Sequence, residues 1–148
     1  MIRLILKGGK LSRWSVFLVD VFICTFVIYL AYLLRFNFQI PQSNQEQLLF
    51  SIPFVLFIRI ISFVVFRTYS GVILHTSTED AIRILLAVTS GTVVILFSNL
   101  VSLGFTEKFI VHHSILIIDY MASMFFLTGF RIFIKVLYLE LTNAQKEV

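Results

Sequence analysis

Four long apolar stretches, separated by short polar segments, dominate the pattern of hydrophobic and polar positions along this chain. They cover residues 15–34, 48–66, 84–103 and 114–134. The first stretch has 20 residues, and a helix of that length spans about 30 Å, the thickness of the hydrocarbon core of a bilayer. The pattern predicts an all-α, polytopic membrane protein. It has four transmembrane helices in two hairpins, joined by a cytoplasmic loop and the start of an interfacial helix.

The polar segments divide the chain into three parts. Residues 1–14 form a basic N-terminal tail in which charged and apolar residues are mixed, which is typical of a segment lying on an anionic membrane surface. Residues 15–138 form the four-helix transmembrane domain. Residues 139–148 are expected to lead toward a soluble domain that is either missing or absent.

Composition places the chain outside the soluble enzymes. Hydrophobic residues make up 59% of the chain and charged residues 14%. In soluble domains, hydrophobic residues average about 45–50% and charged residues about 25%. The net charge is +4, but the basic residues cluster at the ends of the apolar stretches. No basic stripe with interleaved aromatic residues is present, so we expect no nucleic-acid partner. The lipid bilayer is the partner that the composition indicates.

The distribution of Lys and Arg predicts the orientation. With the N-terminus in the cytoplasm, nine basic residues lie in inner segments and two, Arg35 and Lys108, in outer loops. This is a strong positive-inside bias. Four spans then place both termini, and the segment between the second and third spans, on the cytoplasmic side.

Charged residues inside the apolar stretches are the first candidate site. Each costs about 2.5–3.5 kcal/mol at mid-bilayer unless it has a partner or a wet cavity. Asp20 lies roughly 7–8 Å and Arg59 about 10 Å from the inner surface, with Arg131 slightly shallower. We therefore expect Asp20 to meet Arg59 or Arg131, and Asp119, nearer the outer surface, to meet Arg35. Such pairs either fix the register of the bundle or form a proton or substrate relay, and we favour the first interpretation.

Motifs for catalysis, cofactors and metals are absent from the sequence. There is no Gly-x-Gly-x-x-Gly after a strand, no Ser-His-Asp set and no His-Glu-x-x-His. His112 and His113 are adjacent, so on a helix they point about 100° apart and chelate one metal poorly. Cys24, inside the first stretch, is expected to be a small apolar filler. We assign no catalytic, cofactor-binding or metal-binding residue to this segment.

The polar joint between the second and third stretches is the second candidate site. Thr76 or Ser77 can cap the following helix, with Glu79 or Asp80 at capping-box spacing. A cap does not explain the basic and aromatic residues beside it. We therefore expect the joint to contact a partner at the inner interface, through a candidate set of Arg67, Tyr69, His75, Thr76, Ser77 and Asp80.

The joint also carries a family resemblance. The residues Phe66-Arg67-x-Tyr69-Ser70-Gly71-Val72-Ile73-x-His75-Thr76-Ser77-x-x-Asp80 resemble the cytoplasmic loop in the N-terminal membrane domain of CapD-type polysaccharide biosynthesis proteins. These are membrane-bound nucleoside-diphosphate-sugar 4,6-dehydratases/epimerases. The spans add Ala31-Tyr32-Leu33-Leu34-Arg35-Phe36, Ile118-Asp119-Tyr120 and Gly129-Phe130-Arg131, so the resemblance covers about residues 13–138.

The resemblance implies a membrane anchor in capsule, O-antigen or other glycan biosynthesis at the bacterial inner membrane. NAD(P) is implied only for a downstream soluble domain that acts on a UDP-sugar. The implied partners are that domain or other glycan-assembly enzymes, a polyprenyl-phosphate lipid, and a second copy of the chain. Three alternatives stay open: the membrane module of a polyprenyl-phosphate sugar-1-phosphate transferase, a pure assembly subunit, or a small four-span transporter or lipid-linked-sugar flippase. The last would use Asp20 or Asp119 as its coupling group.

Overall fold

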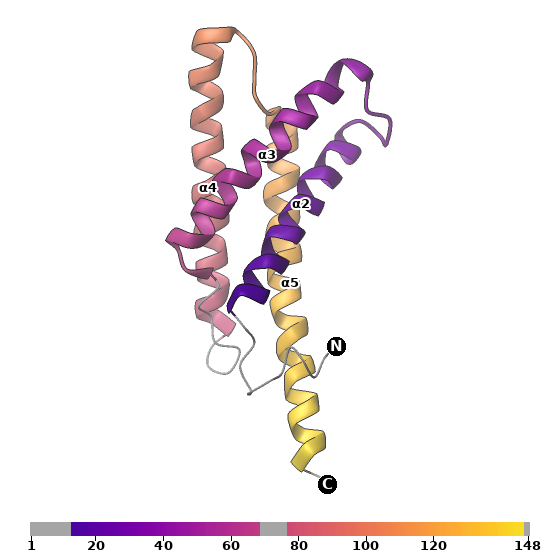
Figure 1. The fold of residues 1–148 in the computed structure, drawn as a ribbon, viewed down its shortest axis with the longest axis vertical. Helices are drawn as coiled ribbons and strands as arrows, with labels where there is room; N and C mark the ends of the chain where they lie inside the picture. The colour runs from indigo at the N-terminus through magenta and orange to yellow at the C-terminus, as the bar shows by residue number, and fades with distance from the viewer. Residues whose placement is uncertain (1–12, 69–76, 147–148) are drawn as a thin grey trace.

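Four helices make up the part of the chain that the computed structural model describes, residues 13–68 and 77–146. They are α2 (Arg13–Arg35), α3 (Gln42–Val65), α4 (Ser77–Thr106) and α5 (His113–Lys146) (Figure 1). Each is long and apolar enough to cross a membrane. The prediction of an all-helical chain with four helices of membrane-spanning length is thereby confirmed for the described residues and indicates a multi-pass membrane protein. The two hairpins and the cytoplasmic loop stay predictions.

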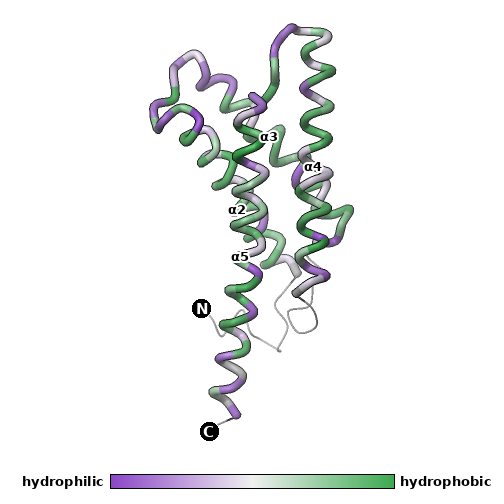
Figure 2. Tube along the Cα trace, turned by 180° about the vertical axis from the view of Figure 1, so that it is seen from behind, coloured by the Kyte–Doolittle hydropathy of each residue, from purple (hydrophilic) through white to green (hydrophobic). Residues whose placement is uncertain are grey.

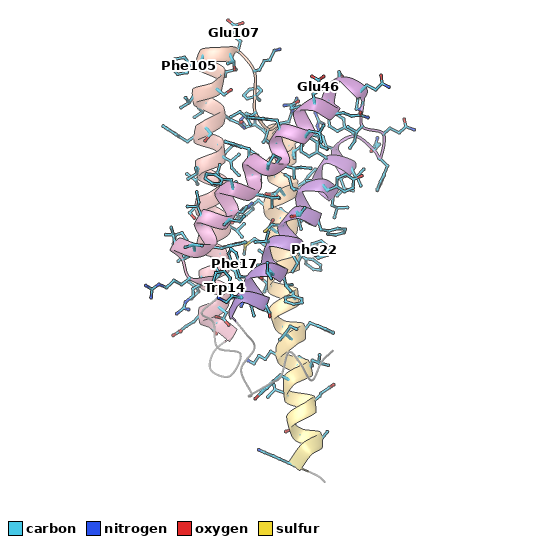
Figure 3. The ribbon with its side chains drawn as sticks, viewed as in Figure 1. Trp14, Phe17, Phe22, Glu46, Phe105 and Glu107 are labelled. Carbon is cyan, nitrogen blue, oxygen red and sulfur yellow. The ribbon has the colours of Figure 1, made fainter. Side chains whose placement is uncertain are left out.

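The helices form a closed ring of neighbours. α2 packs against α3 and α5, and α4 also packs against α3 and α5, so that α2 faces α4 and α3 faces α5 across the diagonals. Trp14 lies at the end of the bundle from which α5 projects, whereas Glu46 and Glu107 lie toward the opposite end (Figure 3). We call these the Trp14 end and the Glu107 end. α5 continues past the other helices at the Trp14 end (Figure 1).

The helices are longer than the apolar stretches that predicted them. α3 begins at Gln42, directly after Pro41 in an extended conformation, and includes polar residues that precede the predicted span at 48. α4 begins at Ser77 and carries Glu79 and Asp80 in its first turn, where acidic groups favour the positive end of the helix dipole. Main-chain hydrogen bonds do not depend on hydropathy, so helices continue through polar residues that an apolar window leaves out.

Two apolar clusters fill the bundle. Ile28, Tyr32, Val55, Ile95 and Ile115 belong to one, and Cys24, Phe63, Ile84, Val88 and Leu127 belong to the other. Large aromatic side chains such as those of Phe22, Phe105 and Phe125 point outward instead and are 73%, 86% and 75% exposed. Figure 2 shows hydrophobic residues along the helices and more hydrophilic ones toward the ends. The exterior therefore suits lipid rather than water.

The connection between α4 and α5 folds back into the bundle. The Asn99 side chain accepts hydrogen bonds from the amides of Ile110 and Val111 (both 3.1 Å) and donates one to the Val111 carbonyl (2.7 Å). Asn99 lies seven residues before the end of α4 at Thr106, about 10 Å along the helix. α5 therefore begins well below the end of α4 (Figure 1).

Candidate functional site

A buried ion pair crosses the bundle diagonal. Arg59 of α3 reaches Asp119 of α5, with Nη2 donating to Oδ2 at 2.6 Å, and both residues are 1% exposed. Arg59 also donates to the Val88 carbonyl (2.7 Å) and the Thr92 hydroxyl (3.2 Å) of α4. The Ser123 hydroxyl donates to the other oxygen of Asp119 at 3.5 Å. The guanidinium group of Arg59, on α3, thus forms hydrogen bonds to both α4 and α5.

The expectation that Asp119 meets Arg35 is wrong. Arg35 is exposed and ends α2, whereas Asp119 lies in the interior beside Arg59. The cause is the folded-back connection, which starts α5 deeper in the bundle than its position in the sequence indicates. Counting residues from the ends of the spans placed Asp119 too near the outer surface.

Gly91 makes room for this pair. A Cβ atom at Gly91 would lie 3.1 Å from the Ser62 hydroxyl and 3.4 Å from Arg59 Nη1. Gly91 therefore faces α3 inside the bundle. Its function in the fold is to let the Arg59 guanidinium group lie against the backbone of α4.

The second ion pair lies at the Trp14 end. Arg131 of α5 donates from Nη2 to Asp20 Oδ2 at 2.7 Å and to the Thr68 carbonyl at 3.1 Å. Asp20 is 1% exposed and the Arg131 side chain 13%. Asp80 of α4 interacts electrostatically with Arg131. Of the two partners predicted for Asp20, the structure provides Arg131, because Arg59 is engaged by Asp119.

The polar joint begins at this second pair. Tyr69, His75 and Thr76 of the predicted contact set lie outside the described residues. Arg67 is exposed just after α3, with a positive φ of 50°, and Ser77 is the first residue of α4. Thr68, which the sequence did not single out, has its carbonyl bonded to Arg131. The two candidate sites predicted separately therefore meet at Asp20, Thr68, Asp80 and Arg131.

Several buried polar atoms of this region have no hydrogen-bond partner among the described residues. At the second pair they are Asp20 Oδ1, Thr68 Oγ1 and Arg131 Nε. In contrast, both carboxylate oxygens of Asp119 are hydrogen-bonded. The two pairs thus differ in their carboxylates. In the Arg59–Asp119 pair both carboxylate oxygens are bonded and only Arg59 Nε has no partner among the described residues, whereas in the Asp20–Arg131 pair a carboxylate oxygen and Arg131 Nε both have none.

The two adjacent histidines have separate surroundings. His112 Nδ1 lies 3.5 Å from the side-chain amide nitrogen of Gln47. The His113 ring packs edge-on against the Phe109 ring, with 4.8 Å between the ring centroids. Over residues 13–68 and 77–146, no group of three or more His, Cys, Asp or Glu side chains is placed to hold a metal ion.

Chemically, the interior offers charge pairing and hydrogen bonding at two depths of a membrane-spanning bundle. Comparisons with protein-family models, with curated proteins and with solved structures found no match to this chain. The resemblance in the joint and the spans therefore stays a prediction.

Proposed function

We propose that this chain is the membrane-anchoring domain of a polysaccharide biosynthesis protein. It would hold a cytoplasmic NAD(P)-dependent UDP-sugar dehydratase/epimerase at the bacterial inner membrane. The observation that carries the proposal is the bundle itself, four membrane-length helices closed around an ion pair that joins three of them. The resemblance of residues 66–80 supplies the class of enzyme.

The proposed topology has two hairpins with both termini in the cytoplasm. It rests on the nine-to-two distribution of basic residues. The start of α2 and the end of α5 lie at the same end of the molecule (Figure 1), which is compatible with termini on one side of the membrane. In this orientation the Trp14 end faces the cytoplasm.

The projecting part of α5 suits an anchor. α5 runs without interruption from His113 to Lys146 and leaves the bundle at the Trp14 end (Figure 1). A continuous helix is stiff, so a soluble domain joined to the end of α5 would be held at a fixed position close to the membrane surface. Confinement there raises the effective concentration of the enzyme near membrane-bound glycosyltransferases and polyprenyl-phosphate lipids.

The test is the location of enzymatic activity in the cell that makes the protein. Dehydratase and epimerase activity on UDP-sugars is measured in washed membranes and in the soluble fraction, with the segment 13–138 present or removed from the gene. We expect the membrane-bound share of the activity to move to the soluble fraction when the segment is removed. Unchanged distribution, or no such activity in either fraction, would refute the anchor function.

One observation favours a second candidate, a small transporter or lipid-linked-sugar flippase. Asp20 is buried and one of its oxygens has no partner among the described residues, as a coupling carboxylate requires. In liposomes, this function predicts proton movement that depends on substrate and is lost in Asp20→Asn. An anchor would show no such movement.

A further inference from the structure

Three buried polar atoms at the Trp14 end have no hydrogen-bond partner among the described residues, and all three lie close to Arg131 Nη2. Asp20 Oδ1, Thr68 Oγ1 and Arg131 Nε each belong to a residue that already takes part in the hydrogen bonds of Arg131 Nη2. Covalent geometry therefore keeps all three within a few ångströms of that nitrogen. Asp20 and Thr68 are only 1% and 2% exposed, so bulk solvent does not satisfy them.

The chemistry of these atoms specifies what fits among them. The carboxylate oxygen accepts, the Nε–H donates, and the threonine hydroxyl does either. An anion would be repelled by Asp20 and a cation by Arg131. A small neutral group that both donates and accepts satisfies the set, and water is the smallest such group; buried waters commonly make about three such bonds.

We propose that Asp20, Thr68 and Arg131 bind a buried water and that this makes Asp20 a proton-binding site reached from the Trp14 end of the bundle. The Arg131 side chain, 13% exposed, marks the route from the surface. The proposal does not depend on the anchor function, because proton binding requires neither a soluble domain nor transport.

The proton step is balanced within the cluster. A proton from a hydronium ion at the surface passes to the bound water, which gives one of its protons to Asp20 Oδ1. Asp20 becomes a neutral carboxylic acid, Arg131 keeps its charge, and the Thr68 carbonyl still accepts from Nη2. The net charge of the Asp20–Arg131 pair therefore rises from zero to +1.

Charged groups from the neighbouring helices act on this equilibrium. From α5, Arg131 is the ion-pair partner of Asp20. From α4, Asp80 contributes a second negative charge, and Arg131, Arg83 and Lys135 contribute positive charges that act on Asp80. From the segment that follows α3, Thr68 contributes its carbonyl and hydroxyl. Asp119 has no comparable access, because both of its oxygens are bonded and both members of its pair are 1% exposed.

The experiment is an infrared titration of the whole chain in lipid nanodiscs. Protonation of a carboxylate produces a carboxylic-acid C=O band whose area is followed as pH falls. The other Asp and Glu side chains also contribute to this band at low pH, so Asp20 is identified by difference between variants. We expect the band to lose one component in Asp20→Asn, and we expect that component to persist in Asp119→Asn and in the exposed-residue control Glu46→Gln. A band with the same area and midpoint in Asp20→Asn as in the unaltered protein, at every pH at which the protein stays folded, would overturn the proposal.

Thr68→Val provides an independent arm if Asp20→Asn does not insert. It removes the hydroxyl and keeps the backbone carbonyl that binds Arg131. We expect the midpoint of the titration to shift, because the water loses one of its three partners. An unchanged midpoint would show that the hydroxyl and its water do not belong to the site.

Sidedness is tested in proteoliposomes whose orientation is measured by protease cleavage of the end of α5. Acidification on the side that carries the Trp14 end is expected to produce the band at once. A band that appears equally fast when only the Glu107 side is acidified would contradict a site open at the Trp14 end.

Discussion

Removing Asp119 while leaving Arg59 is the perturbation that tests the structural basis of the bundle most sharply. In Asp119→Leu, Arg59 still donates to Val88 and Thr92, so its charge stays in the interior without a counter-ion. Breaking a buried pair in this way costs about 3–5 kcal/mol. Arg59→Met is expected to cost a similar amount, because it leaves the carboxylate unpaired.

The double variant Arg59→Met/Asp119→Leu is expected to recover most of this loss. Replacing both members of a buried pair by apolar residues is often neutral or even stabilising. The two single changes are thus strongly non-additive, as expected for residues in direct contact. The stabilisation that the pair contributes lies in its matched charges, and either charge alone opposes folding.

Cys24 provides the assay. It is the only cysteine of the chain and is 3% exposed, so a thiol reagent reaches it only when the bundle opens. A loss of 3–5 kcal/mol corresponds to labelling that is about 10²–10⁴ times faster, since 1.4 kcal/mol is a factor of ten. Glu46→Gln, at an exposed position, is the control and should label like the unaltered protein.

The reasoning would be refuted by either of two results. Asp119→Leu could label Cys24 no faster than the unaltered protein, which would show that the charge is not buried. Alternatively, the double variant could label as fast as the single ones, which would show that the two residues do not depend on each other.

Two further substitutions test contacts that position the helices. Gly91→Ala should speed Cys24 labelling by about 5- to 140-fold, because the added Cβ would press on Ser62 and Arg59 and overpacking costs about 1–3 kcal/mol. Gly129→Ala, with nothing within 4 Å of its Cβ, is the matched control and should be neutral or stabilising. Asn99→Ala should release the folded-back connection and speed hydrogen exchange at the amides of residues 110 and 111, which lose their acceptor. Ser98→Ala, whose hydroxyl bonds only within α4, should leave this exchange unchanged. Equal exchange in both variants would contradict this role of Asn99.

Much of the fold could be predicted from the sequence because hydropathy reports directly on membrane-length helices. The four apolar stretches all lie within helices of the structure, apart from Phe66, which follows the last residue of α3. Helix ends could not be predicted from the same signal, because α5 continues to Lys146 through polar residues.

The interior contacts were predictable only where depth could be counted reliably. Asp20 and Arg131 lie at similar depth from one surface, and the structure pairs them. Asp119 was misplaced because the count took all helices to begin at the same level. The amide of Asn99, isolated in an apolar stretch, was the one indication of the folded-back connection. The role of the Thr68 carbonyl could not be predicted, because a backbone group carries no sequence signal.

The central claim is a four-span membrane bundle with the Trp14 end in the cytoplasm. Single cysteines at the exposed positions Gln39, Thr78 and Lys108, introduced into a Cys24→Ala background, test it with a membrane-impermeant thiol reagent applied to intact and to permeabilised cells. The account predicts that Gln39→Cys and Lys108→Cys label in intact cells, whereas Thr78→Cys labels only after the inner membrane is opened. Labelling of Thr78→Cys in intact cells, with Gln39→Cys and Lys108→Cys protected, would contradict it.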